Sequence, residues 1–241
     1  EGDYERAVET FKSLINEHPS NQSLAVAHYF LAESLKQLSD FKGADQAYAS
    51  SMALQPGILD DFLQEKRAQV LESMGDYSSA IEAYQSAIAA SSYDRSDLKL
   101  QIGKIYANQG DLASAIKIYL EAYETSSNEY IKAAANLLAG QAYMELGFPE
   151  QAYARFHDSI NNFPRSYDSY SGLVTLVNAG QPVNELQRGL VDYYAGQYGY
   201  AAEAFARFIN ANPEHNGVAH YYRGYSLRAL EDISGALAEW Q

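Results

Sequence analysis

Residues 75–84 read GDYSSAIEAY, and nearly the same ten residues occur at two other places in the chain. Residues 2–11 read GDYERAVETF, and residues 110–119 read GDLASAIKIY. In each stretch an alanine and an aromatic residue lie four positions apart, so they share one face of a helix. The Gly-Asp pair in front of them is typical of a break between two helices. The pattern therefore predicts a unit of two helices that recurs along the chain.

The alanine of this pattern recurs with a near-constant period, at Ala7, Ala44, Ala80, Ala115, Ala152, Ala201 and Ala236. Five of the six intervals are 35 to 37 residues long, and the interval that follows Ala152 is 49 residues long. An aromatic residue follows each alanine by four positions, at Phe11, Tyr48, Tyr84, Tyr119, Phe156, Phe205 and Trp240. A small residue precedes all but the first alanine by twelve positions, at Ala32, Ala68, Gly103, Gly140, Gly189 and Gly224. A period of this size is the signature of a stacked-repeat protein.

The spacing also predicts how one repeat packs. The small residue on the first helix lets the second helix approach closely, and the aromatic residue fills the space beside the contact. Prolines end the second helices at Pro19, Pro56, Pro164 and Pro213, and Ser92 and Ser127 take the equivalent positions in two other repeats. Such a hairpin has two apolar faces, which it can bury only by stacking on its neighbours.

This pattern resembles the tetratricopeptide repeat, whose period is about 34 residues, and the resemblance covers nearly the whole chain. It implies an all-α solenoid, a right-handed superhelix of helical hairpins, with about five full repeats and a half repeat at each end. We expect an orphan second helix in residues 1–20, four repeats in 21–166, an inserted helix in 167–180, and one full and one truncated repeat in 181–241. Because both ends fall inside a repeat, we expect the single solenoid to be an excised fragment of a longer protein.

The long interval contains an extra stretch, YDSYSGLVTLVNAG, at residues 167–180. Asp168 is a suitable N-cap, and Gly180 is a suitable stop signal. The residues between them form a one-sided apolar pattern, at Gly172, Leu173, Leu176 and Val177. The stretch therefore predicts one extra helix near residues 168–179.

Composition excludes several classes of function. The formal net charge is −14, which disfavours binding to nucleic acid and to anionic membranes. The chain has no cysteine, and no stretch approaches the roughly 18 apolar residues of a membrane helix. The acidic balance leaves two interpretations open: a surface that keeps a solenoid soluble, or a groove for a basic partner.

No catalytic or metal-binding pattern is present. The five histidines (His18, His28, His157, His215 and His220) lack the spacing of a zinc helix. Neither a GxSxG elbow nor a phosphate-binding loop occurs, and Asp60-Asp61 is typical of a helix N-terminus rather than of an acid/base pair. We therefore expect no enzyme activity, metal or cofactor in this chain.

The first helices of tetratricopeptide hairpins line the concave face, so the resemblance implies a binding surface there. In this register the surface collects Tyr29, Glu33, Lys36, Gln37, Phe62, Glu65, Gln69, Lys104, Asn108, Gln141, Glu145, Tyr193, Tyr194, Tyr221, Tyr225 and Arg228. Lys104 and Asn108 alone do not rebuild the Lys, Asn and Arg clamp with which some members of the family bind acidic chaperone tails. We expect a different protein or peptide partner.

Tyrosine is unusually frequent, with 21 residues, of which seven lie within residues 193–225. Two interpretations are open for this group. The tyrosines pack between helices, as aromatic residues do in this repeat, or they form a partly exposed surface for a partner domain or a glycan.

The last third of the chain carries a second resemblance, to the helical segment of bacterial lytic transglycosylases. The similar stretches are RGLVDYYAGQY (188–198), NPEHN (212–216) and AHYYRGYSLRAL (219–230). In that family the catalytic glutamate belongs to a lysozyme-like domain that this chain lacks. The resemblance implies a helical arm of a cell-wall-acting enzyme outside the cytoplasm, in the periplasm or cell envelope, near peptidoglycan glycan strands.

Two rival hypotheses belong to other classes of function. The chain is a stand-alone adaptor that binds a peptide or helix in its concave groove, or it is a lipoprotein scaffold for envelope assembly. One sequence does not rank the exposed side chains that decide between them.

Overall fold

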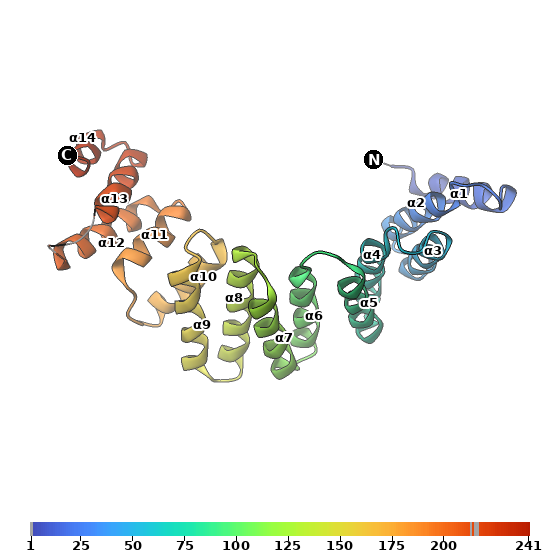
Figure 1. The fold of residues 1–241 in the computed structure, drawn as a ribbon, viewed down its shortest axis with the longest axis horizontal. Helices are drawn as coiled ribbons and strands as arrows, with labels where there is room; N and C mark the ends of the chain where they lie inside the picture. Colours follow the sequence, from blue (N-terminus) through green and yellow to red (C-terminus); the bar gives the residue numbers. More distant parts are fainter. Residues whose placement is uncertain (1, 213, 215–216) are drawn as a thin grey trace. The chain divides into compact units, whose positions relative to one another are not determined.

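The computed structural model describes residues 2–212, 214 and 217–241, and every regular element in these residues is an α-helix (Figure 1). The prediction of an all-α chain is confirmed. Pro213 and His215, which the sequence places at the end of a repeat, lie outside the described residues. The helices are α1 (Tyr4–Glu17), α2 (Leu24–Gln37), α3 (Phe41–Leu54), α4 (Asp60–Ser73), α5 (Tyr77–Ala90), α6 (Ser96–Asn108), α7 (Leu112–Thr125), α8 (Glu129–Glu145), α9 (Pro149–Asn162), α10 (Tyr167–Asn178), α11 (Glu185–Tyr194), α12 (Tyr198–Ala211), α13 (Val218–Ala229) and α14 (Ile233–Glu239).

The second helix of a hairpin usually begins at an aspartate. The carboxylates of Asp40, Asp76 and Asp111 each accept a hydrogen bond from the backbone N–H three residues later, at 2.9 to 3.2 Å. This satisfies one of the free N–H groups of the first helical turn. Gly75 and Gly110 precede two of these caps with φ of +77° and +81°, a conformation that favours glycine. The Gly-Asp pair of the repeat is therefore a helix stop followed by a helix start.

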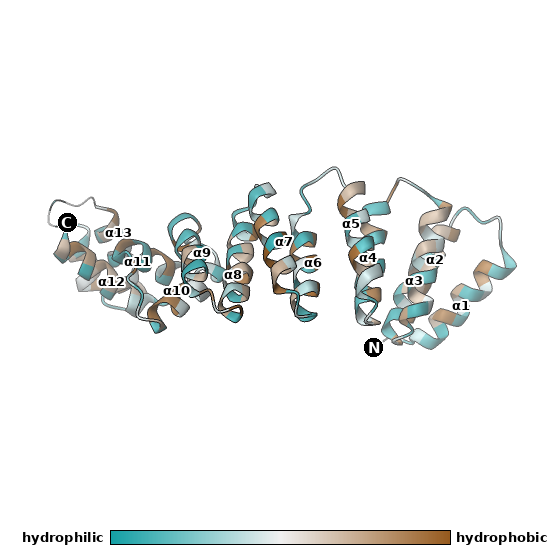
Figure 2. Cartoon of the chain, turned by 90° about the horizontal axis from the view of Figure 1, so that it is seen from below, coloured by the Kyte–Doolittle hydropathy of each residue, from teal (hydrophilic) through white to brown (hydrophobic). Residues whose placement is uncertain are grey.

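The chain forms two compact units, Glu1–Ile105 and Tyr106–Gln241. In the first unit, α1 to α5 pack in chain order, each against the next. Their core contains Leu31, Ala44, Tyr48, Leu63 and Val70. Hydrophilic and hydrophobic residues are interspersed along the helices (Figure 2).

The second unit packs in the same way, from α7 to α14. One core cluster joins Phe156, Ile160, Leu173 and Val191, and another surrounds Phe205. Among the described residues, no helix is both long enough and apolar enough to cross a membrane.

The residues of the repeat signature lie where neighbouring helices meet. Ala44, Ala80, Ala115, Ala152 and Ala201 are fully buried. The aromatic residues Tyr48, Tyr84, Tyr119, Phe156 and Phe205 are at most 2% exposed, whereas Trp240 is 40% exposed. Gly140, Gly189 and Gly224 lie directly under the rings of Phe156, Phe205 and Trp240, respectively. Each glycine thus makes room for an aromatic ring of the helix that follows.

The extra helix predicted in the long interval is present as α10, which packs on α8, α9 and α11. The predicted N-cap was wrong: Asp168 lies inside the helix, and the Ser166 hydroxyl accepts a hydrogen bond from its N–H. Both residues suit a cap, and the turn after α9 places the serine at the helix start. Val177 also departs from the predicted apolar face, because it is 36% exposed at its edge. Gly180 ends the helix with a φ of +67°, as expected.

The close fit of ring and glycine predicts the effect of a single methyl group. A Cβ atom on Gly189 would lie 2.5 Å from Cε1 of Phe205, so the ring must shift. We expect Gly189→Ala to lower the free energy of unfolding by about 1–2 kcal/mol, since overpacking outweighs the gain in helix propensity. Chemical denaturation followed by circular dichroism measures this loss.

Two glycines of the same unit serve as controls. A Cβ atom on Gly172 would lie 3.2 Å from Phe156, and one on Gly199 in α12 would meet nothing within 4 Å. We expect a smaller effect of Gly172→Ala and no loss for Gly199→Ala. Equal stability of all three variants would contradict the packing described for Gly189.

Candidate binding site

The last two hairpins bring five tyrosines together on their first helices. Tyr193 and Tyr194 end α11, and Tyr221, Tyr222 and Tyr225 follow one side of α13. We call these five residues the tyrosine surface. Tyr221 is 51% exposed, and the other four are partly buried. Both interpretations of the tyrosine-rich stretch therefore hold in part: the rings pack on one another and still present an exposed face.

The rings of the tyrosine surface form a connected cluster. The Tyr222 ring lies 5.0 Å from that of Tyr193 and 5.9 Å from that of Tyr194, both edge to face. The Tyr194 and Tyr222 hydroxyls share a hydrogen bond of 2.8 Å. Tyr221 and Tyr225, one turn apart, have ring centroids 4.7 Å apart. Such contacts fix the side-chain rotamers, so the surface is ordered without a partner.

A buried ring supports this cluster from below. Phe205 of α12 is fully buried, lies over Gly189 of α11 and stacks on Tyr222 at 6.1 Å. The glycine and the aromatic residue of the repeat thus position α11 and α13 relative to each other. The tyrosine surface is a consequence of the same packing that builds the hairpins.

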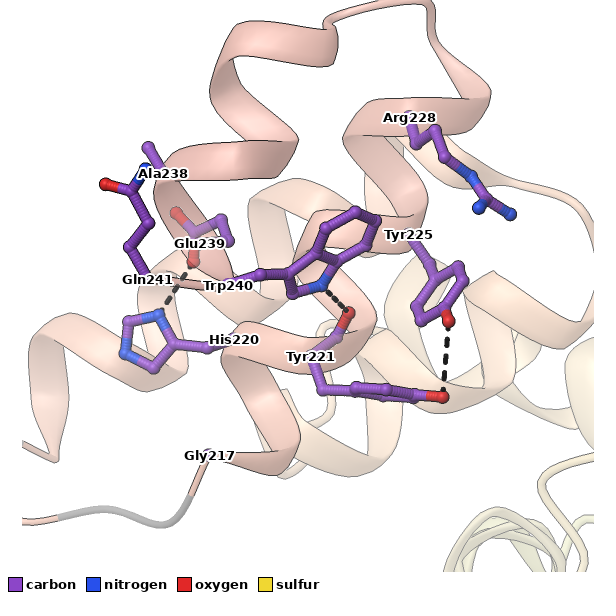
Figure 3. A pocket seen from close by; sticks show the side chains of 9 residues that line it. All are labelled: Gly217, His220, Tyr221, Tyr225, Arg228, Ala238, Glu239, Trp240 and Gln241. Carbon is purple, nitrogen blue, oxygen red and sulfur yellow. Dashed lines mark hydrogen bonds and ion pairs between the residues drawn. The ribbon is translucent and has the colours of Figure 1, made fainter.

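A cavity of about 620 Å³ opens at one end of the tyrosine surface (Figure 3). Its lining residues are Gly217, His220, Tyr221, Tyr225, Arg228, Ala238, Glu239, Trp240 and Gln241. The indole N–H of Trp240 donates a hydrogen bond of 3.1 Å to the backbone carbonyl of Tyr221, and the ring lies over Gly224. The Trp240 and Tyr225 ring centroids are 5.0 Å apart. The cavity is therefore an aromatic pocket between α13 and the end of α14.

The carboxylate in this pocket is already engaged. Glu239 is largely buried and accepts hydrogen bonds from Arg223 and from His220, the latter at 2.7 Å between Oε2 and Nδ1. These contacts tie α14 to α13. Glu239 therefore has little capacity left for a ligand.

Two arginines lie on the rings of the tyrosine surface. The Arg228 guanidinium lies 4.7 Å from the Tyr225 ring centroid, and the Arg165 guanidinium lies 5.3 Å from that of Tyr194. Arg165 comes from the turn between α9 and α10. These contacts are cation–π interactions. They add two positive charges to a surface of neutral rings.

Two phenols of this surface, Tyr193 and Tyr222, have a raised pKa and stay protonated at neutral pH. The hydrogen bond with Tyr194, together with burial, raises the pKa of Tyr222 to about 12. Burial also raises the pKa of Tyr193. A protonated Tyr193 can donate a hydrogen bond to a ligand, whereas the Tyr194 and Tyr222 hydroxyls already share one with each other.

The first unit holds the other aromatic residues predicted for the concave face. The rings of Tyr29 and Phe62 lie 5.9 Å apart. Glu33 accepts a hydrogen bond from the Tyr48 hydroxyl at 2.6 Å and pairs with Lys66 at 3.3 Å. Glu33 is therefore already engaged in contacts within the protein.

Glu65 and Gln69, also predicted for this face, are likewise engaged. Gln69 donates a hydrogen bond of 3.1 Å to Glu65, and Arg95 pairs with the same carboxylate at 2.6 Å. Both glutamates thus link neighbouring repeats, which the repeat pattern did not predict. The remaining predicted residues stay predictions for binding; Lys36 is partly buried, and Gln37, Lys104, Asn108, Gln141 and Glu145 are exposed.

Sequence analysis predicted five members of this candidate site for the concave face and did not assign three others to it. It placed Tyr193, Tyr194, Tyr221, Tyr225 and Arg228 on the binding face. It treated Trp240 only as a packing residue, and it did not assign Tyr222 or Arg165 to that face. Tyr222 lies two residues before Gly224, a repeat position from which no residue was predicted for the concave face. No sequence signal places the inter-helix turn of Arg165 over Tyr194. Within the described ranges, no three His, Asp or Glu side chains lie close enough to hold a metal ion.

Comparison with known proteins agrees with the repeat. A family model described as tetratricopeptide repeat matches residues 65–130 and 186–241, and another of the same description matches residues 1–21. The TPR repeat-containing protein MJ1428 of Methanocaldococcus jannaschii is 23% identical over 246 residues. The match includes 98% of this chain but 40% of that relative, so the chain spans less than half of the relative's length.

Two solved structures are similar in fold. The C-terminal part of a TPR repeat-containing protein from Cytophaga hutchinsonii matches with a TM-score of 0.56 at 19% identity, over 99% of this chain and 88% of that one. The crystal structure of MamA matches with a TM-score of 0.54 at 17% identity, over 73% of this chain and 92% of that one. These comparisons give no support to the resemblance to lytic transglycosylases.

Proposed function

Because the chain belongs to the tetratricopeptide repeat family, we propose that it is a non-catalytic protein-interaction scaffold that binds a peptide segment on its tyrosine surface. The observation that carries this proposal is the cluster of five tyrosines on α11 and α13 with an aromatic pocket at its end. Tyrosine and tryptophan are enriched in the energetic centres of protein interfaces.

The arrangement suits a peptide for two reasons. The rings are held by their mutual contacts and by Phe205, so binding costs little side-chain entropy. The pocket beside Tyr221, Tyr225 and Trp240 has room for one or two large side chains, which would anchor a segment that continues along the tyrosine surface. The tyrosine hydroxyl groups and the two arginines supply polar contacts beside this anchor.

A selection from a random 12-residue peptide display library tests the proposal. Peptides enriched on the wild-type chain are then titrated against the double variant Tyr221→Ala, Tyr225→Ala by fluorescence anisotropy. We expect the double variant to bind at least tenfold more weakly, because two anchoring rings are lost.

Tyr93→Ala, Tyr167→Ala is the matched control, because both tyrosines are highly exposed and lie outside the tyrosine surface. We expect this variant to bind within about twofold of the wild type. Enriched peptides that bind the Tyr221→Ala, Tyr225→Ala variant as tightly as the wild type would refute the tyrosine surface as the site.

The more specific assignments of a parent enzyme, a glycan partner and a cellular location stay predictions. A parent enzyme that acts on the cell wall, contact with peptidoglycan and a location in the cell envelope rest on the sequence resemblance alone. The adaptor hypothesis requires only the binding surface described above, and it is therefore the simpler account of the chain.

A further inference from the structure

The sign of the charge on the tyrosine surface is opposite to that of the chain. The formal net charge is −14, yet the two charged groups stacked on the rings of this surface are the guanidiniums of Arg165 and Arg228. The sequence left open a groove for a basic partner. The local charges favour the opposite partner.

Both guanidiniums lack a carboxylate within ion-pair distance in the part of the chain that the structure describes. Most other arginines of the chain are engaged: Arg67 with Asp45, Arg95 with Glu65, Arg188 with Asp192, Arg207 with Glu185 and Arg223 with Glu239. Arg165 and Arg228 are both exposed. Arg165 also makes a side-chain hydrogen bond with Tyr194, which leaves its other N–H groups and those of Arg228 to a ligand.

Stacking prepares these two side chains for a carboxylate. A guanidinium that lies over a ring keeps its N–H edges directed away from the ring face. Such an edge binds a carboxylate through two parallel hydrogen bonds. The rings of Tyr194 and Tyr225 therefore restrict the two arginines before a ligand arrives.

No carboxylate of the site competes for them. Glu239 in the pocket is held by Arg223 and His220. Asp192 on α11 is buried beside Arg188. The surface between the two arginines is made of tyrosine side chains, whose hydroxyl groups can donate hydrogen bonds to carboxylates.

We propose that the tyrosine surface recognises an acidic peptide segment, with carboxylate side chains paired to Arg165 and Arg228 and an aromatic or apolar side chain in the pocket lined by Tyr221, Tyr225 and Trp240. The inference rests on the proposed function and adds the chemistry of the partner. The two guanidiniums lie on different rings, one from the turn after α9 and one from α13. Such a pair suits a segment with carboxylate side chains at two positions better than a peptide whose single carboxylate is its C-terminus.

The test uses three pools of synthetic 12-residue peptides with amidated C-termini. The pools share the same content of Tyr, Trp, Leu, Gly and Ser and differ only in whether the remaining positions are Glu, Gln or Lys. Each pool is titrated by fluorescence anisotropy at low and at physiological salt. We expect the Glu pool to bind the wild-type chain most tightly and to weaken as salt rises.

The double variant Arg165→Glu, Arg228→Glu then reverses the local charge. We expect it to bind the Glu pool at least tenfold more weakly and the Lys pool more tightly than the wild type does. The matched control is Lys42→Glu, Lys117→Glu, which changes the net charge equally at exposed positions outside this surface. We expect the control to change either affinity by less than threefold.

The outcomes separate the two proposals. If the Gln and Lys pools bind as tightly as the Glu pool, and binding is still lost in Tyr221→Ala, Tyr225→Ala, the acidic partner is refuted and the peptide-binding surface stands. If no pool binds and that variant behaves as the wild type, both proposals fail. Recognition of acidic side chains is also contradicted if the affinity rises only when the peptides carry free C-termini. It is likewise contradicted if the chain binds an acidic polysaccharide but not the Glu pool.

Discussion

Replacing Phe156 with alanine lowers the free energy of unfolding by about 3–5 kcal/mol, the usual cost of removing a fully buried aromatic side chain. Phe156 of α9 is 1% exposed and lies between two glycines, Gly140 of α8 and Gly172 of α10. Its ring therefore joins a regular hairpin to the inserted helix. The variant leaves a cavity that neither glycine can fill, and urea denaturation followed by circular dichroism measures the loss.

An exposed phenylalanine of the same region provides the control. Phe148, just before α9, is 49% exposed and makes no side-chain cap hydrogen bond. We expect Phe148→Ala to change the free energy of unfolding by less than about 0.5 kcal/mol. A Phe156→Ala variant as stable as Phe148→Ala would show that α10 does not pack as described.

The second large effect concerns a buried carboxylate. Asp192 on α11 is 4% exposed, and its Oδ2 makes no hydrogen bond in the described residues, although Arg188 lies 3.7 Å away. Burial raises the pKa of Asp192 to about 6, and the attraction of Arg188 offsets only part of this effect.

The sign of the pH dependence follows from this raised pKa. Below about pH 3 the group is protonated in both states, so it carries no penalty. As the pH rises towards 6, the unfolded state loses its proton first, and the folded state becomes less stable by an amount that reaches about 3 kcal/mol. Above that pH the penalty is complete and constant.

Asp192→Asn removes this penalty. We expect the free energy of unfolding of the variant, relative to the wild type, to increase by about 3 kcal/mol between pH 3 and pH 7. Arg188, whose side chain is 25% exposed, can turn its charge towards solvent. The exposed Glu150→Gln variant controls for the loss of one carboxylate. A stability difference for Asp192→Asn that stays constant with pH would contradict the buried, ionised carboxylate.

Much of the fold follows from the sequence, because local signals and the repeat agree. The second helix that the repeat predicts around Ala44 and Tyr48 is α3 (Phe41–Leu54), since Asp40 caps its start and Pro56 follows its end. The inserted helix was also predicted. Its first residue was not, because Ser166 and Asp168 are both good caps and only the turn geometry decides between them.

The candidate site was predictable only where it follows the repeat. Tyr193 and Tyr221 lie at fixed positions of successive first helices, so the register alone places them on one face. Arg165 is different, because its position over Tyr194 depends on how the chain turns into α10. Glu33 and Glu65 were expected to bind a partner, and instead each pairs with a basic residue of the next repeat. Such pairs depend on contacts across repeats that a single sequence does not contain.

The most direct test of the account is nuclear magnetic resonance of the chain with ¹³C-labelled tyrosine rings, assigned by single Tyr→Phe substitutions. A peptide enriched in the display selection is added in increasing amounts, and the chemical shifts of the tyrosine rings are followed. We expect the ring chemical shifts of Tyr193, Tyr194, Tyr221, Tyr222 and Tyr225 to change, and those of the exposed Tyr93 and Tyr167 to stay the same. Shifts at Tyr29 or Tyr93 with an unchanged tyrosine surface would contradict it.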